Sequence, residues 1–207
     1  MKTLKAIQHD LANPLVQLQF LEESISQQPS FGEKLADAGL YPLGTRGIEI
    51  LQVNVGKMCN QTCAHCHVDA GPDRKEIMTR ETMVECLSAI SSSQIETVDV
   101  TGGAPEMNSN FRWFVDEVSK LGRRVMVRSN LTILTVNGKY RTLPDFFAEH
   151  KVALVSSLPC YTAENTDRQR GAGVCDSAGK ALRRLHHGGD GPPGRGLDRE
   201  LGAPPRG

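Results

Sequence analysis

The chain has 207 residues, a length that suits one domain with or without a tail. Its 24 basic and 24 acidic residues cancel, so no charge imbalance points to nucleic acid or an anionic membrane as a partner. The N-terminus lacks the apolar core of an export signal, and no run approaches the roughly 18 apolar residues of a membrane span. Six cysteines without an export signal indicate a reducing compartment, so we expect a soluble cytoplasmic protein.

Residues 1–47 are expected to form a helical extension, in which Asn13 caps a helix that begins at Pro14. Strands and helices then alternate over residues 48–185, an order typical of a parallel α/β sheet covered by helices. Asp176 is the expected N-cap of the last helix. The strands are predicted near 48–55, 96–101, 125–128 and 152–157, and the helices near 79–92, 110–121, 144–150 and 177–185.

The segment 186–207 has a different composition from the rest of the chain. It is rich in glycine and proline, and Leu197 and Leu201 are its only sizeable apolar residues. Such a sequence cannot bury a core, so we expect it to be disordered. It interrupts the strand–helix series where the next strand is due.

Polar motifs follow each of the predicted strands. Loops that follow parallel strands lie on one face of the sheet, and barrel enzymes carry their active sites there. The pattern therefore predicts an enzyme. The motifs are the loop Cys59–Cys66, Gly102–Glu106, Ser129-Asn130 and Leu158–Tyr161.

The cysteine loop has the spacing Cys59-x3-Cys63-x2-Cys66. Three thiolates in one short loop suit a 4Fe–4S cluster in which one iron keeps an open position. A structural zinc site with His65 or His67 as fourth ligand is the alternative, although zinc sites favour paired ligands from two separate places. A cysteine cluster that binds nothing is a third interpretation.

The cysteine loop after the first strand, together with Gly102–Pro105 after the second, resembles the radical S-adenosylmethionine (SAM) superfamily. Three longer runs, residues 51–56, 66–72 and 157–165, resemble the arsenosugar-biosynthesis radical SAM proteins. The resemblance covers about residues 30–185 and implies a partial (β/α) barrel of the radical SAM type, with parallel strands and incomplete at the C-terminus. It also implies that residues 186–207 are not native family sequence but the product of a frameshift or a mis-assigned gene end.

The resemblance further implies that Cys59, Cys63 and Cys66 hold a 4Fe–4S cluster whose open iron binds SAM. A reductant such as flavodoxin or ferredoxin would supply the electron that cleaves SAM to methionine and a 5′-deoxyadenosyl radical. In this branch the expected reaction joins the deoxyadenosyl group to a methylated arsenic compound, a small-molecule substrate. A zinc-binding structural or regulatory module and an inactive fragment remain as alternatives.

Residues that contact SAM follow from the same resemblance. The loop Gly102, Gly103, Ala104, Pro105 and Glu106 would meet the methionine amino group, although Glu106 lies one place later than the acidic residue of the usual Gly-Gly-Glu-Pro form. On this basis Gly103→Val should spare the cluster absorbance and weaken SAM binding. The remaining assignments are His65 to adenine, Ser129 and Asn130 to the ribose, and Arg170 to the SAM carboxylate.

Each of these assignments has an alternative that the residues alone leave open. His65 would otherwise be a surface loop residue, Ser129-Asn130 an ordinary turn, and Arg170 an exposed arginine.

Cys160 follows the fourth strand and would meet a thiophilic substrate such as trivalent arsenic, which makes it the candidate catalytic thiol. Cys86 is expected to be inert packing in a helix, and Cys175 has no assignment.

Overall fold

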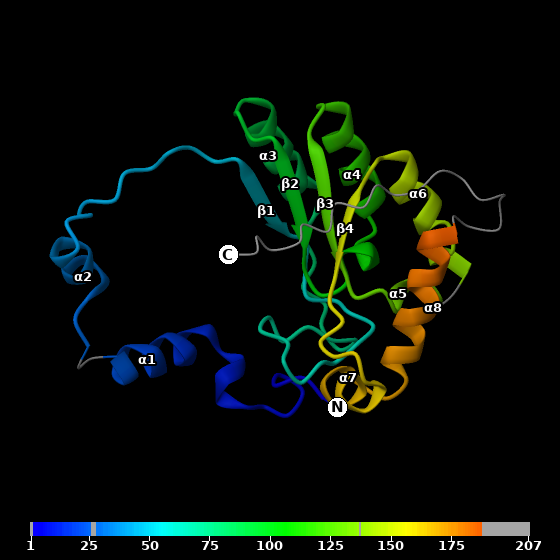
Figure 1. Ribbon diagram of the computed structural model, residues 1–207, viewed down its shortest axis with the longest axis horizontal. Helices are drawn as coiled ribbons and strands as arrows, with labels where there is room; N and C mark the ends of the chain where they lie inside the picture. The colour runs from blue at the N-terminus through cyan, green and yellow to red at the C-terminus, as the bar shows by residue number, and fades with distance from the viewer. Residues whose placement is uncertain (1, 26–27, 137, 188–207) are drawn as a thin grey trace, which may run out of the picture.

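The computed structural model describes residues 2–25, 28–136 and 138–187, and it contains one sheet of four parallel strands (Figure 1). The strand order β1-β2-β3-β4 never reverses, so each strand pairs with the next one along the chain. This winding is that of a (β/α) barrel rather than of a doubly wound sheet. The strands are β1 (Ile50–Asn54), β2 (Thr97–Thr101), β3 (Arg124–Ser129) and β4 (Ala153–Ser156).

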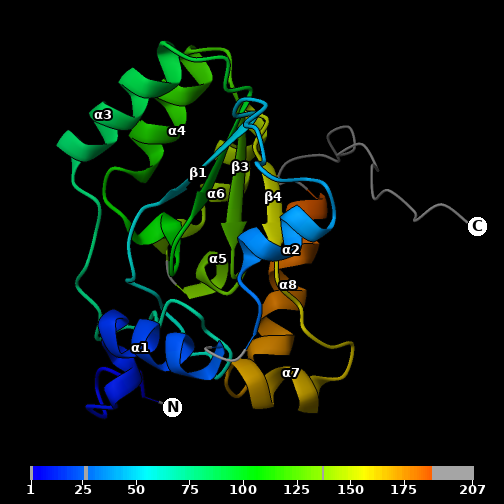
Figure 2. The ribbon, with the colours of Figure 1, turned by 90° about the vertical axis from the view of Figure 1, so that its left-hand side faces the viewer.

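The helices that connect the strands lie on one face of the sheet, as Figures 1 and 2 show. Side chains from the four connecting helices and from the last helix join the valines of the strands in one main core cluster. The predicted α/β fold with a partial barrel is therefore confirmed. The helices are α3 (Arg80–Ser91), α4 (Phe111–Lys120), α5 (Ile133–Val136), α6 (Leu143–Glu149), α7 (Ala163–Arg170) and α8 (Val174–His187), with short 3-10 turns at Pro105–Met107 and Gly138–Tyr140.

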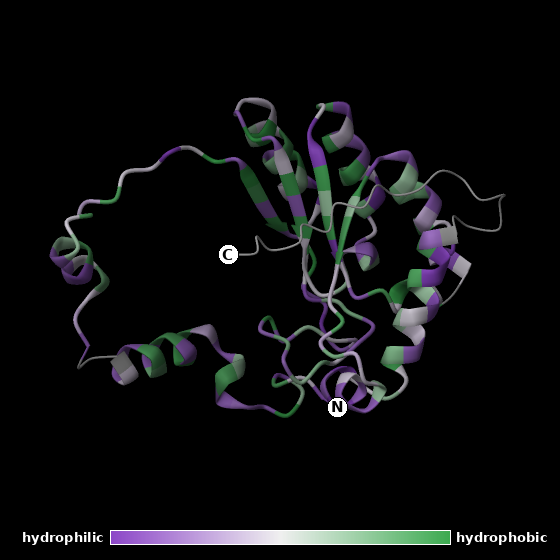
Figure 3. Ribbon diagram, viewed as in Figure 1, coloured by the Kyte–Doolittle hydropathy of each residue, from purple (hydrophilic) through white to green (hydrophobic). Residues whose placement is uncertain are grey.

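The two faces of the sheet differ in polarity because successive side chains of a strand point to opposite sides. On β2, Val98 and Val100 are fully buried against the helices, whereas Asp99 lies on the opposite face. Figure 3 shows the resulting alternation of hydrophobic and hydrophilic positions along the strands. We call the side without connecting helices the open face. In a closed barrel this face lines the interior.

The N-terminal segment contains a 3-10 turn at Asp10–Ala12 and the helices α1 (Pro14–Ile25) and α2 (Phe31–Asp37). The predicted start of α1 is confirmed, since the Asn13 side chain accepts a hydrogen bond from the Leu15 N–H at 3.0 Å. The first residues dock on the loop that follows the cysteines, because Asp69 accepts the N–H of Leu4 at 2.7 Å. No helix among the described residues is long and apolar enough to cross a membrane.

The last helix differs from its prediction. It begins at Val174, three residues before the expected start, so Asp176 lies inside its first turn and is not the N-cap. Asp167 at the end of α7 takes the capping role, since its carboxylate accepts the N–H groups of Gly173 at 2.7 Å and Cys175 at 2.8 Å. Residues 186 and 187 end α8, and the rest of the predicted disordered tail lies outside the described residues.

Candidate functional site

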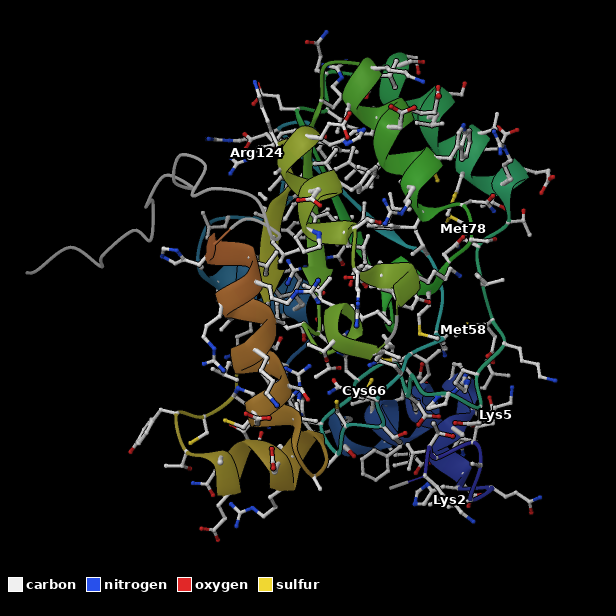
Figure 4. The ribbon with its side chains drawn as sticks, turned by 90° about the vertical axis from the view of Figure 1, so that its right-hand side faces the viewer. Lys2, Lys5, Met58, Cys66, Met78 and Arg124 are labelled. Carbon is white, nitrogen blue, oxygen red and sulfur yellow. The ribbon has the colours of Figure 1, made fainter. Side chains whose placement is uncertain are left out.

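The loops that follow β1 and β2 form one hydrogen-bonded unit at the carboxyl end of the sheet. The Gly103 N–H donates to the Gly56 carbonyl at 2.9 Å, and the Ala104 N–H donates to the Met58 carbonyl at 2.9 Å. Figure 4 shows Met58 and Cys66 near this end of the sheet. The glycine motif and the cysteine loop, 40 residues apart in sequence, are thus in direct contact, as the sequence predicted for loops that follow parallel strands.

The cysteine loop presents three thiols with different exposure. Cys59 is 5% exposed, while Cys63 and Cys66 are half-buried. Backbone N–H groups point at two of the sulfurs: Gln61 N lies 3.4 Å from Cys59 Sγ, and Ala70 N lies 3.3 Å from Cys66 Sγ. Hydrogen bonds of this kind stabilise thiolates and tune cluster sulfurs. The donor set therefore fits a group that needs thiolate ligands.

Burial raises the pKa of the Cys59 thiol to about 11, and the neighbouring thiols of Cys63 and Cys66 add to the shift. The Gln61 N–H and the Asn130 amide act in the opposite direction, because they favour the charged sulfur. In the free chain the Cys59 thiol is therefore protonated at neutral pH. A metal that binds Cys59 must displace this proton.

Asn130, at the end of β3, supports the cysteine loop directly. Its Nδ2 lies 3.5 Å from Cys59 Sγ and donates to Asn60 Oδ1 at 2.8 Å, while its Oδ1 accepts the Ile133 N–H at 3.1 Å. Asn60 also donates to the Thr132 hydroxyl at 2.9 Å. Both ends of the Asn130 amide thus have protein partners. The only signs of this link in the sequence are the amide at the strand end and the amide after Cys59.

Arg170 is buried, which excludes the alternative that it is an exposed arginine. Its Nη2 donates to Gln61 Oε1 at 3.1 Å, its Nη1 donates to the Ser157 carbonyl, and the Gln169 carbonyl accepts the Ala64 N–H at 2.8 Å. The end of α7 is therefore joined to the cysteine loop. The sequence did not predict α7, and Gln61 was not recognised as its partner.

Several buried polar atoms around the two loops have no hydrogen-bond partner among the described residues. They are both carboxylate oxygens of Glu106, Nε2 of Gln61 and Nε of Arg170; a further such atom, Arg123 Nε, lies before β3 at the opposite end of the sheet. Buried polar groups are nearly always paired in folded proteins. Unpaired acceptors and donors beside a thiol loop fit a site for a polar ligand with both a cationic and an anionic group, and the amino and carboxylate groups of SAM have that character.

Among the described residues, no three His, Cys, Asp or Glu side chains converge as the ligands of a single ion do. A zinc site would need such convergence, whereas the thiolates of a cluster bind separate irons. His65 is exposed between Cys63 and Cys66.

Cys160 lies in the loop after β4 and is partly exposed. Its Sγ is 3.4 Å from the Thr162 hydroxyl, and its carbonyl accepts the Thr166 hydroxyl at 2.8 Å. The hydroxyl and backbone N–H of Thr162 lower the pKa of the Cys160 thiol. Within the described ranges, this thiol makes no hydrogen bond to the cysteine loop. Ser129, also assigned from the sequence, is buried and accepts the Leu131 N–H at 3.2 Å.

Glu106 is the buried acid of the glycine loop, and burial raises its pKa to about 7, whereas Ser129 and the Glu106 N–H act in the opposite direction. The ordinary pKa of the unfolded chain is 4.5. Between these two values the folded chain retains a proton that the unfolded chain releases, so this group contributes less stability as the pH rises, and its penalty is complete above pH 7.

We therefore expect Glu106→Gln to raise the free energy of unfolding of the cofactor-free chain at pH 8 by up to an order of 3 kcal/mol. The gain should shrink toward pH 5, and urea unfolding at the two pH values measures it. Glu149→Gln, at an exposed position on α6, is the matched control. Equal stability of the Glu106→Gln variant and the parent chain at both pH values would contradict the assigned burial.

Comparison with known proteins agrees with this geometry. The sequence model of the radical SAM superfamily matches residues 53–159, just over half of the chain. GTP 3′,8-cyclase of Heliobacterium modesticaldum is 32% identical over 111 residues, which cover 52% of this chain and 32% of that protein. Mycofactocin maturase MftC of Mycobacterium tuberculosis is 27% identical over 128 residues, covering 61% of this chain and 32% of that protein. The chain thus spans about a third of the length of these relatives.

Solved structures share the fold. Streptococcus suis SuiB bound to S-adenosylmethionine aligns with a TM-score of 0.57 and 13% identity over 74% of this chain and 34% of that one. The enzyme anSMEcpe with bound AdoMet and a peptide aligns with a TM-score of 0.51 and 15% identity over 66% of this chain and 40% of that one. With the family match over the cysteine loop and the strands β2, β3 and β4, the chain belongs to the radical SAM superfamily of enzymes, which use a 4Fe–4S cluster and S-adenosylmethionine.

Proposed function

We propose that this chain is a radical SAM enzyme, or the N-terminal part of one, in which Cys59, Cys63 and Cys66 hold the 4Fe–4S cluster. The observation that carries the proposal is the hydrogen-bonded unit formed by the cysteine loop and the glycine loop. In it, three thiols lie beside buried polar atoms that have no partner among the described residues.

The chain's own residues would bind and orient SAM. The buried carboxylate of Glu106, whose oxygens have no hydrogen-bond partner among the described residues, is suited to accept the methionine ammonium. The unpaired Nε of Arg170 is the donor left for the carboxylate. We assign exposed His65 to the adenine and the Ser129-Asn130 strand end to the ribose. When bound, the reduced cluster supplies the electron that cleaves SAM to methionine and a deoxyadenosyl radical.

For the substrate we propose a methylated arsenic compound that receives the deoxyadenosyl group, as in arsenosugar biosynthesis. The support is the resemblance of residues 51–56, 66–72 and 157–165, together with the environment of Cys160. A thiol whose pKa is lowered by a neighbouring hydroxyl has more thiolate at neutral pH, and a thiolate is the form that binds soft metals and metalloids. Cys160 would therefore hold trivalent arsenic at the carboxyl end of β4.

The test uses the full chain, reconstituted anaerobically with iron and sulfide, then reduced with dithionite in the presence of SAM and dimethylarsinous acid. Mass spectrometry would detect 5′-deoxyadenosine and any product that contains both arsenic and the deoxyadenosyl group. Such a product supports the full proposal. Formation of 5′-deoxyadenosine alone rejects arsenic as substrate, and absence of both products from a cluster-loaded protein rejects the enzyme assignment for this chain.

Cys160→Ser is expected to lower formation of the arsenic product about tenfold or more, because a hydroxyl binds trivalent arsenic far less well than a thiolate. Cys175→Ser, at the start of α8, is the control and should behave like the parent chain. The comparison is made on initial rates at equal iron content. Unchanged product formation by Cys160→Ser would remove this thiol from the substrate site.

A further inference from the structure

A charged cluster lies on the open face of the sheet and has no part in the cofactor site described above. Gln52 of β1, Asp99 of β2 and Arg128 of β3 meet there, since Gln52 and Asp99 are register partners in neighbouring strands. Arg128 shares this face because Val127, the residue before it, is fully buried toward the helices. The cluster spans three strands and points to the side that lines the interior of a barrel.

Asp99 is the centre of the cluster. Arg128 donates to both of its oxygens, with Nε 3.1 Å from Oδ1 and Nη2 2.8 Å from Oδ2, and Gln52 Nε2 donates to Oδ2 at 2.9 Å. Burial by itself would raise the pKa of Asp99, but the hydrogen bonds from Arg128 and Gln52 hold it below its ordinary value. Asp99 is therefore an anion at neutral pH, and its position fixes that of the guanidinium.

An ion pair with one buried member is a weak source of stability, and apolar residues of similar size often stabilise a fold as well or better. Here the Asp99 side chain is 4% exposed, whereas that of Arg128 is 50% exposed. The pair thus holds a half-exposed cation in a fixed orientation. Packing of this face does not require a guanidinium held in one orientation, so the pair is suited to binding a ligand.

The contacts of Arg128 leave one edge of its guanidinium available. Asp99 occupies the edge formed by Nε and Nη2. Nη1 has no hydrogen-bond partner within the described part of the chain, so the edge formed by Nη1 and Nη2 is available to a ligand. This edge matches the two oxygens of a carboxylate or a similar anion in a bidentate arrangement.

The cluster lies just beneath the candidate site. Gln52 and Asp99 each precede the last residue of their strands by two positions, which places them about 7 Å below the strand ends. Arg128 directly precedes Ser129 and Asn130. A small molecule bound on the open face at Arg128 would therefore have its other end near the loops that carry the cysteines and Glu106.

We propose that Arg128, held by Asp99, binds an anionic two-oxygen group of the substrate on the open face of the sheet. This proposal rests on the proposed function, because it takes the open face below the cofactor loops as the substrate side. The shared chemistry is a singly charged pair of oxygens, which a carboxylate or a pentavalent dialkylarsinate supplies; the uncharged trivalent dimethylarsinous acid used above does not supply it. Gln52 completes the cluster by donating to Asp99, so the Asp99 oxygens do not compete with the ligand.

Equilibrium dialysis of the anaerobically reconstituted full chain with SAM tests the proposal, with dimethylarsinate and radiolabelled acetate as separate probes. At least one probe should bind saturably to the parent chain, and the tighter one identifies the source of the two-oxygen group. Arg128→Gln should weaken that binding about tenfold or more. Arg124→Gln is the matched control, because Arg124 starts the same strand on the same face, roughly 13 Å away; Figure 4 shows it at the end of the sheet opposite Cys66.

Loss of Arg128 leaves Asp99 as a nearly buried charge, so a second variant separates binding from folding. Asp99→Asn combined with Arg128→Gln retains a neutral hydrogen-bonded pair, and it should melt near the parent temperature but not bind the probe. Saturable binding by either Arg128 variant at the parent affinity, or no binding of either probe to the parent chain, overturns the proposal. If the parent binds the probe through Arg128 yet cleaves no SAM, the proposed function fails and the anion site stands.

Discussion

Replacing Cys59 by alanine will leave the chain unable to assemble its cluster. In the proposed function each of the three thiolates in the loop holds a different iron, and the loop has no fourth cysteine to replace a lost ligand. Cys59 is also the thiol with the most support, since the Gln61 N–H and the Asn130 amide both point at its sulfur. We expect Cys59→Ala to lose nearly all bound iron, the broad visible absorbance and all formation of 5′-deoxyadenosine.

Cys86→Ala is the control for general damage, because Cys86 is a partly buried core neighbour on α3. It should keep the iron content of the parent chain with a small loss of stability. Iron and sulfide analysis after anaerobic reconstitution, with circular dichroism to verify folding, measures the effect. If folded Cys59→Ala kept full iron content, Cys59 would not be a ligand of either a cluster or a zinc ion.

The order and type of the main elements could be read from the sequence because they depend on local patterns. Alternating valines in residues 97–101 predict a strand with one apolar face, and the Phe111–Leu121 stripe predicts a helix; both are confirmed. The site could be located for the same reason. Once parallel strands are predicted, the motifs that follow them must meet at one end of the sheet.

What the sequence could not provide are features that depend on contacts between distant segments. Asp176 has the position expected of an N-cap, but Asp167 of the preceding helix takes over because α7 and α8 are joined by a tight turn. The burial of Arg170 depends on Gln61, which is 109 residues away in the chain. No periodicity within α7 or the cysteine loop reports that pairing.

The structure gives Gly103 a different role from the one predicted from the sequence, because that role also depends on a contact with a distant segment. The sequence predicts that its missing side chain makes room for SAM, so that Gly103→Val would spare the cluster absorbance. In the structure, a Cβ at this position would come within 2.5 Å of the Met58 carbonyl oxygen and 2.9 Å of Cys59 Cβ. The close approach is to the cysteine loop itself, and Ala70 Cβ also lies at 2.9 Å.

We therefore expect Gly103→Val to lose most of its cluster and, with it, SAM binding and SAM cleavage. A backbone carbonyl and two Cβ atoms cannot move aside as the end of a flexible side chain can, so the loop must shift and Cys59 with it.

Gly103→Ala tests the same contact with a single methyl group and should also lower the iron content. Gly179→Ala on α8 is the matched control, because an added Cβ there meets only Arg183 at 3.8 Å. Iron analysis and SAM dialysis on folded protein decide whether Gly103 makes room for SAM or for the cysteine loop. Full iron content with weak SAM binding in Gly103→Val would show that the glycine serves SAM and that the cysteine loop tolerates the side chain.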